Sequence, residues 1–102
     1  MHAVVNRISL SEQLDEAELA AAQRDLEQQA GEVEGLSAIH VLRTQEGDLL
    51  LVIIGDDEAA LDRTRDQLGN AFMRRHIIPH AAGPPNRTVT EVLLTYERSR
   101  DA

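Results

Sequence analysis

Asn6 is the residue whose type and position point most directly to chemistry. It lies in a stretch that alternates like a strand, and Val4 and Ile8 share its face by the two-residue period of a strand. An asparagine on an apolar face is uncommon, because its amide donors and its carbonyl acceptor all need hydrogen-bond partners. One interpretation is a pocket amide that orients a substrate or an intermediate. The other is a side chain that bonds to nearby backbone or lies at the sheet edge.

Three histidines are candidates for moving protons or binding a metal ion. His40 lies in a second apolar stretch and is a candidate general base, since an imidazole titrates near neutral pH; the alternative is a satisfied core or interface residue. His76, the other candidate for proton transfer, is four residues from His80, a spacing that on a continuous helix would aim both at one metal ion. Pro79 interrupts such a helix, and there is no cysteine to complete a ligand set. We therefore predict neither a metal site nor a bound cofactor.

Phe72 and Tyr96 are the only phenylalanine and tyrosine of a chain without tryptophan. We expect Phe72 on the buried side of a helix and Tyr96 late in the last strand, and both are candidates for lining a ligand pocket. Tyr96 could donate a proton there or pack at an interface. No serine lies in the sequence context of a nucleophile elbow, so a serine hydrolase is not supported.

Composition restricts the class of partner. With 102 residues, of which 42% are apolar, the chain fits one globular domain over residues 1–102 in which 99–102 form a frayed tail. A formal net charge of −8 and the scarcity of aromatic residues argue against binding nucleic acid or anionic membrane surfaces. No apolar stretch approaches the roughly 20 residues that span a bilayer, and the N-terminus does not resemble a signal peptide. Together with the absence of cysteine, these features predict a cytoplasmic protein.

Six segments are predicted to position these residues. Apolar periodicity predicts strands at 3–10, 36–44, 49–54 and 87–97, one helix between Asp15 and Gly35, and another from Gly55 to near His76. Asp15 and Glu18 have the spacing of a capping box, and Gly47 supplies the positive φ of a hairpin turn. The order is that of an α+β, ferredoxin-like βαββαβ fold, with a four-stranded antiparallel sheet and two helices on one face.

The stretch from Leu49 to Ile54 is apolar at every position. A strand with one solvated face alternates apolar and polar residues, so this strand must be covered on both faces. The two helices of the chain cover one face, and the chain is too short to supply a second layer. We therefore predict a homodimer in which two sheets pack face to face. The alternative is a monomer with an open sheet, as in ferredoxin-like domains that bind RNA or metals. Such sheets usually carry basic and aromatic residues or cysteines, and the stretch 49–54 has none of these.

The order and length of the elements, with Asn6, Gly35 and the segment Asp57-Glu58-Ala59, resemble the dimeric α/β-barrel superfamily. Within it, the chain is similar to the antibiotic-biosynthesis-monooxygenase-like domains. The resemblance implies a dimeric barrel and cofactor-independent oxygenation of a small hydrophobic or aromatic molecule. It implies that Asn6 orients the ligand while His40 or His76 handles protons. Oxygenases of this kind commonly pair the asparagine with a tryptophan, which this chain lacks.

Two other functions are compatible with the same sequence. Haem-degrading members of the group carry a haem-ligating histidine late in the second helix, the region of His76. A non-catalytic structural or accessory homodimer, with its cavity filled by side chains, is the alternative from another class. A cavity of a few hundred cubic ångströms that holds Asn6 and a histidine favours a dimer that binds a small hydrophobic molecule, with or without oxidising it. A packed interior with Asn6 bonded to backbone favours the accessory dimer.

Overall fold

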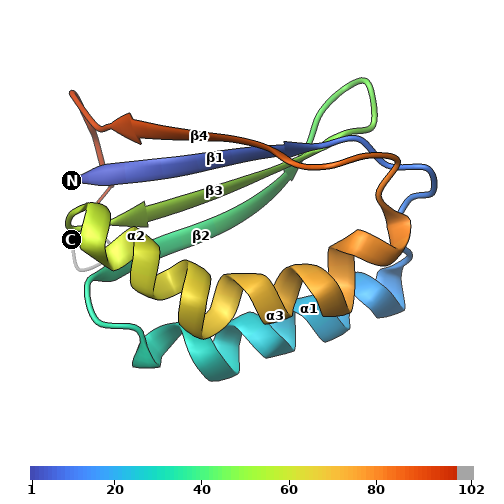
Figure 1. Cartoon of the computed structure of the whole chain (residues 1–102), viewed down its shortest axis with the longest axis horizontal. Helices are drawn as coiled ribbons and strands as arrows, with labels where there is room; N and C mark the ends of the chain where they lie inside the picture. The colour runs from blue at the N-terminus through green and yellow to red at the C-terminus, as the bar shows by residue number, and fades with distance from the viewer. Residues whose placement is uncertain (99–102) are drawn as a thin grey trace.

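The computed structural model describes residues 1–98, and four strands of this part form one antiparallel sheet. The strands are β1 (His2–Ile8), β2 (Leu36–Arg43), β3 (Leu49–Gly55) and β4 (Asn86–Glu91), in the spatial order β2-β3-β1-β4 (Figure 1). β1 and β3 are therefore the central pair. The predicted α+β, βαββαβ fold is confirmed.

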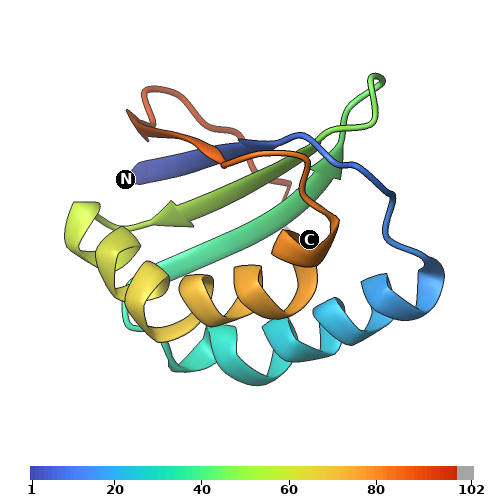
Figure 2. The same ribbon diagram turned by 45° about the vertical axis from the view of Figure 1, so that its right-hand side comes forward.

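Two helical segments cover one face of the sheet, as the two views in Figures 1 and 2 show. The first is α1 (Glu16–Gln29), continued by the 3₁₀ turn η1 (Ala30–Glu32). The second segment consists of α2 (Glu58–Thr64), the π-helical η2 (Arg65–Gly69), α3 (Asn70–Phe72), the π-helical η3 (Met73–Ile77) and the 3₁₀ turn η4 (Ile78–His80). Within residues 1–98, none of the helices has the length and apolar character needed to cross a membrane.

Side-chain caps set where both helical segments begin. The amide of Glu18 donates to Oδ1 of Asp15 at 2.8 Å, and the amide of Asp15 donates to Oε1 of Glu18 at 2.9 Å, which confirms the predicted capping box. Asp57 caps α2 by accepting from the amide of Ala60 at 2.8 Å. Each cap satisfies backbone donors that the first turn leaves without a partner, so the start of each helix is encoded locally.

The strand register assigns every sheet residue to a face. Val4, Asn6 and Ile8 of β1 lie opposite Ile53, Leu51 and Leu49 of β3, and these side chains face the helices. The core forms between them and the helices, and its buried members include Ile8, Leu49, Leu51, Leu68, Phe72 and Ile77. The opposite, outer face of the sheet carries the apolar side chains Val5, Ala38, Leu42, Leu50, Val52 and Ile54. Within residues 1–98, no helix covers this outer face (Figure 2).

The last strand ends at Glu91, whereas the sequence predicts a strand to Glu97. Its pairing stops where β1 begins: His2 lies opposite Glu91, and the amide of Val92 donates to the carbonyl of Met1 at 3.0 Å. The residues that follow extend past the last partner position of β1, so their apolar pattern has no strand within residues 1–98 to pair with. The predicted length of this strand is therefore wrong at its C-terminal end.

Gly35 joins α1 to β2 at a position that only glycine fits well. Its φ is +83°, and a Cβ there would lie 2.8 Å from Cβ of Ala60 and 3.0 Å from Nη2 of Arg63. Positive φ strains a residue with a side chain, and the close approach of α2 adds a steric clash. Gly31, in the preceding 3₁₀ turn, has nothing within 4 Å of the corresponding position.

We expect Gly35→Ala to lower the free energy of unfolding by about 1–3 kcal/mol, because the backbone strain and the contact with Ala60 act together. Gly31→Ala is the matched control and should leave stability unchanged or raise it by up to about 1 kcal/mol. Urea unfolding of both variants at one protein concentration makes the comparison. Equal stabilities would show that the turn accommodates a side chain.

Candidate functional site

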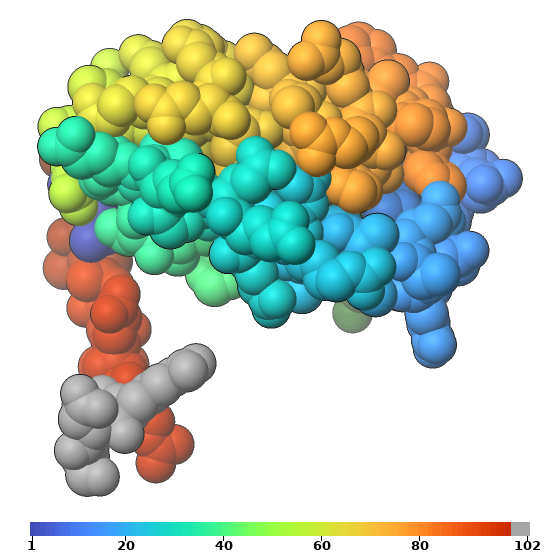
Figure 3. All heavy atoms as spheres, turned by 90° about the horizontal axis from the view of Figure 1, so that it is seen from below, coloured from blue at the N-terminus to red at the C-terminus, as the bar shows by residue number. Residues whose placement is uncertain are grey.

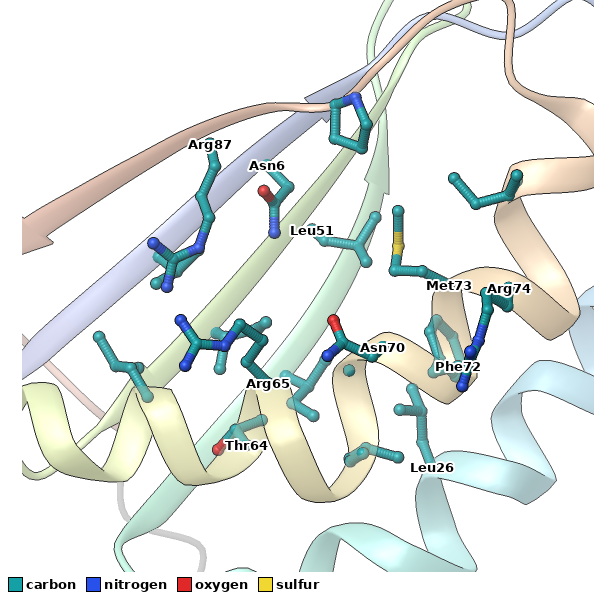
Figure 4. Close-up of a pocket in the computed structure, with 18 residues that line it drawn as sticks. Asn6, Leu26, Leu51, Thr64, Arg65, Asn70, Phe72, Met73, Arg74 and Arg87 are labelled. Carbon is teal, nitrogen blue, oxygen red and sulfur yellow. The ribbon is translucent and has the colours of Figure 1, made fainter.

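A pocket of about 560 Å³ lies between the sheet and the second helical segment (Figure 4). The sheet supplies Val4, Leu51 and Ile53, and the helical segment supplies Leu61, Leu68 and Met73. Its volume falls in the range of small-molecule sites, and its wall is mostly apolar with a few polar groups. The pocket is therefore the candidate ligand site of this protein.

The amide of Asn6 points into this pocket from β1. Asn6 is half-buried and lies opposite Leu51, and its side chain makes no hydrogen bond with the residues that the structure describes. Asn70 presents a second amide from the helical side, and Figure 4 shows the two amides pointing toward one another. An amide held open in an apolar pocket can donate to or accept from a ligand, which is the condition for orienting one.

The charged residues that line the pocket are all arginines: Arg65, Arg74 and Arg87. Asp66 accepts a 3.0 Å hydrogen bond from Nε of Arg65, and this bond raises the pKa of the guanidinium further above its ordinary range. Among the residues that the structure describes, no carboxylate and no histidine belongs to the lining. The pocket therefore offers cationic donors but no general base.

His40 lies outside this pocket. It is exposed on the edge strand β2, on the outer face of the sheet opposite Val52. It borders a second hollow of about 340 Å³ between β2 and α1, together with Leu19 and Leu26. A role as general base for the main pocket has no geometric support within one subunit and stays a prediction.

His76 packs against α1 and does not line the main pocket. Its Nε2 lies 3.0 Å from Oδ2 of Asp25, and Nη1 of Arg75 donates to the same oxygen at 2.7 Å. Burial alone would raise the pKa of Asp25, but the hydrogen bonds from His76 and Gln29 and the charge of Arg75 outweigh it and hold the pKa below its ordinary value. This cluster joins the two helical segments, which is a structural role.

His80 makes a different contact from His76, so the two do not converge on one site. Its Nε2 lies 2.6 Å from Oε2 of Glu18, at the start of α1, and its Nδ1 lies 3.5 Å from Oε1 of Glu12. Among residues 1–98, no three histidine, aspartate or glutamate side chains are placed to hold a metal ion. The four-residue spacing therefore reflects two separate links to α1.

The two aromatic candidates occupy different surroundings. Phe72 is buried and lines the main pocket, with its ring centroid 5.1 Å from that of His76. Tyr96 is 87% exposed on the segment after β4, and it does not line the pocket. The early end of β4 is the reason, because the segment leaves the sheet before Tyr96. The structure thus brings Asn6 and Phe72 together and leaves His40, His76 and Tyr96 outside.

Arg65, Asn70 and Arg87 are pocket residues that reasoning from the sequence missed. Arg65 carries a signal, because it lies four residues after Leu61 and three before Leu68, a spacing that places it on the same side of the helix as these two buried leucines. Arg87 has no local signal. It reaches the pocket because β4 pairs with β1 in a register that places it opposite Asn6.

Comparisons with known proteins bear on the fold. No protein-family model and no curated protein sequence matches this chain. Among solved structures, an antibiotic biosynthesis monooxygenase matches with a TM-score of 0.71 and 14% identity, over 92% of this chain and 100% of that one. SnoaB, a cofactor-independent oxygenase from Streptomyces nogalater, matches with a TM-score of 0.66 and 15% identity, over 95% and 97%. MhuD with two manganese protoporphyrin IX molecules bound per active site matches with a TM-score of 0.63 and 20% identity, over 96% and 100%.

These likenesses extend over nearly the whole chain and confirm the predicted resemblance at the level of the fold. The chain has the fold of the antibiotic biosynthesis monooxygenase structures. At identities of 20% or below, the shared fold does not carry the activity of any one of these proteins to this chain.

We expect Asp25→Asn to lower the free energy of unfolding by about 1–3 kcal/mol at neutral pH, because it removes the ionised acceptor of the cluster. The folded-state pKa of Asp25 is depressed, so its contribution is complete above the ordinary value of 3.8 and is lost as the pH falls below 3.8 toward the folded-state pKa. The stability difference between the variant and the parent should therefore shrink below pH 3.8.

Denaturant unfolding at several pH values tests this expectation. Glu27→Gln on the same helix is the control, since Glu27 is exposed and its Oε1 accepts a hydrogen bond from Nε2 of Gln23 at 2.9 Å. Its effect should stay within about 0.5 kcal/mol. If Asp25→Asn remains less stable than the parent by the same amount at low pH, the ionised carboxylate of Asp25 is not the source of the stabilisation.

Proposed function

We propose that this protein is a homodimer whose subunits each bind a small aromatic molecule in the pocket between the sheet and the helices. One observation carries the proposal: the pocket of about 560 Å³ is mostly apolar, yet the amide of Asn6 points into it. An apolar wall favours burial of an apolar ligand, and one or two polar groups fix its orientation. The open pocket and the unbonded amide of Asn6 favour this proposal over the accessory dimer with a filled cavity, while the histidine expected beside Asn6 is not part of the lining that residues 1–98 form.

A second candidate function is cofactor-independent oxygenation of the bound molecule. The fold likeness to SnoaB and the position of Asn6 favour it. Without a cofactor, the substrate itself must supply electrons to O₂, so it needs an acidic C–H next to aromatic rings and a carbonyl. Removal of one proton leaves an enolate, and the amide of Asn6 would donate to its oxygen. Overall, a CH₂ group and O₂ give a ketone and water.

The pocket restricts which substrates this reaction could take. Its lining contains neither a carboxylate nor a histidine, so no side chain there is suited to remove a proton near neutral pH. The substrate must therefore be acidic enough to ionise with water as the acceptor. Nearby arginines, such as Arg65 and Arg87, would favour the resulting anion.

Haem binding through His76 receives less support from the geometry. Nε2 of His76 lies 3.0 Å from Asp25, in the contact between the two helical segments, and the residue does not line the pocket. A bound haem would require His76 to leave that contact. The likeness to MhuD supports the fold alone.

The homodimer is supported by two apolar surfaces. On the outer face of the sheet, Leu50, Val52 and Ile54 are only half-buried, although β3 is a central strand. Leu93 and Leu94, on the segment after β4, are 81% and 94% exposed. Figure 3 shows this segment standing away from the body of the molecule. Apolar surface of this extent is typical of a subunit interface, and a second sheet would cover the outer face of β3.

The pocket proposal predicts that anthrone, a tricyclic ketone with an acidic CH₂, raises the melting temperature of the protein. If the protein is an oxygenase, anthrone and O₂ should also give anthraquinone and water faster than in buffer. Asn6→Leu should keep binding within about threefold while lowering the turnover rate at least about 100-fold, because it removes the donor to the enolate oxygen. Calorimetry, an oxygen electrode and product absorbance provide the readouts.

Asn86→Leu is the control, since Asn86 is exposed at the start of β4 and does not line the pocket. It should leave both binding and turnover unchanged. Binding without oxygen uptake would retain the ligand-binding proposal and reject the oxygenase. Absence of binding by anthrone and other tricyclic aromatic compounds would reject the pocket proposal.

The dimer proposal predicts that Leu42→Glu on the outer face raises the dissociation constant of the dimer at least about tenfold, because it places a charge in an apolar interface. Val89→Glu is a matched control: Leu42 is 47% and Val89 is 45% exposed, but Val89 lies opposite Val4, on the other face of the sheet. Sedimentation velocity at micromolar concentration compares the two. A parent protein that sediments as a monomer would reject the dimer.

A further inference from the structure

The charges around the pocket differ in sign from those of the chain as a whole. The chain carries 18 acidic and 10 basic residues, yet the charged residues that line the pocket are three arginines and no acid. Arg65 and Arg74 come from the second helical segment and Arg87 from β4, so segments distant in sequence supply the same charge. Such an arrangement favours a negatively charged ligand.

Arg87 is the arginine with the clearest freedom to bind an anion. It is exposed, and no carboxylate of residues 1–98 lies within 4.0 Å of its guanidinium. It lies opposite Asn6 across the β1–β4 pair, and Figure 4 shows its guanidinium on the same side of the pocket as that of Arg65. A ligand group between them would face two sets of N–H donors, with the amide of Asn6 nearby.

Arg65 is partly occupied but retains a donor. Asp66 accepts from its Nε at 3.0 Å, and Oδ1 of Asp62 lies 3.6 Å from its Nη1. Of the five N–H donors of the guanidinium, only the one on Nε makes a hydrogen bond within residues 1–98. Both aspartates are exposed and neither lines the pocket, so the remaining donors of Arg65 can serve a ligand.

We infer that the pocket binds an aromatic molecule that carries a carboxylate, with its ring system in the apolar part and its carboxylate between Arg65 and Arg87. This inference rests on the proposed ligand-binding function and specifies the class of ligand. The planar guanidinium matches a carboxylate with two parallel N–H donors. The apolar part, which includes Phe72 and Leu68, takes the rings.

Two compounds of nearly equal shape test the charge directly. Anthracene-2-carboxylate and anthracene-2-carboxamide have the same ring system and are both fluorescent, but only the first is anionic at pH 7. We expect the acid to bind about tenfold more tightly than the amide, as one charge-assisted contact at a partly exposed site provides. Fluorescence titration of the full chain measures both dissociation constants.

Variants that each remove one arginine charge test which residues cause the acid to bind more tightly than the amide. Arg87→Gln and Arg65→Gln should each reduce the preference for the acid to about threefold or less, and the double variant should abolish it. Affinity for the amide should stay the same in all variants, which shows that the pocket remains folded. Arg24→Gln removes the same charge from an exposed position on α1 that does not line the pocket, and it should keep the tenfold preference.

The possible results distinguish failure of the carboxylate inference from failure of the ligand-binding proposal on which it rests. Equal binding of acid and amide, or an equal loss of preference in Arg24→Gln and Arg87→Gln, would overturn the carboxylate inference and leave the pocket function standing. Failure of both compounds to bind would overturn both.

Discussion

The pairing of β3 with strands on both of its edges is the constraint on which the rest of the structure depends. β1 and β2 take all of its lateral hydrogen bonds, and its side chains from Leu49 to Ile54 are apolar on both faces. The helices cover one of these faces, and the second sheet of the proposed dimer would cover the other. The same register places Asn6 opposite Leu51 and Arg87 opposite Asn6, so the sheet that requires cover also builds the pocket wall.

The parts of the fold encoded by local signals could be predicted from the sequence. The apolar periods predicted all four strands and both helical segments, because burial on one face of an element leaves a regular trace. The capping box of Asp15 and Glu18 and the positive φ of Gly47 depend on neighbouring residues alone. The apolar outer face could be predicted from the stretch 49–54 alone. Both helices of a βαββαβ fold lie on one face of the sheet, so the other face of this apolar strand stays bare.

Properties that depend on pairing between distant segments could not be predicted. The end of β4 at Glu91 is set by the start of β1, which no period within residues 87–97 encodes. The place of His76 depends on how the second helical segment is rotated against α1, and that rotation turns it toward Asp25 and away from the pocket. Arg87 lines the pocket because of the β1–β4 register, and nothing in the sequence around it distinguishes it from an ordinary exposed arginine.

The separation of charge described for the pocket has a kinetic consequence. A surface with more acids than bases repels a small anion at most points, while three arginines attract it at one. The resulting field steers an approaching anion toward the pocket, so its association rate constant should exceed that of a neutral compound of the same shape. Because mobile ions screen fields beyond about 10 Å at 0.1 M ionic strength, that advantage should fade as salt is added. In the proposed site, the three arginines would thus attract a small anion within a surface whose net charge argues against nucleic acid.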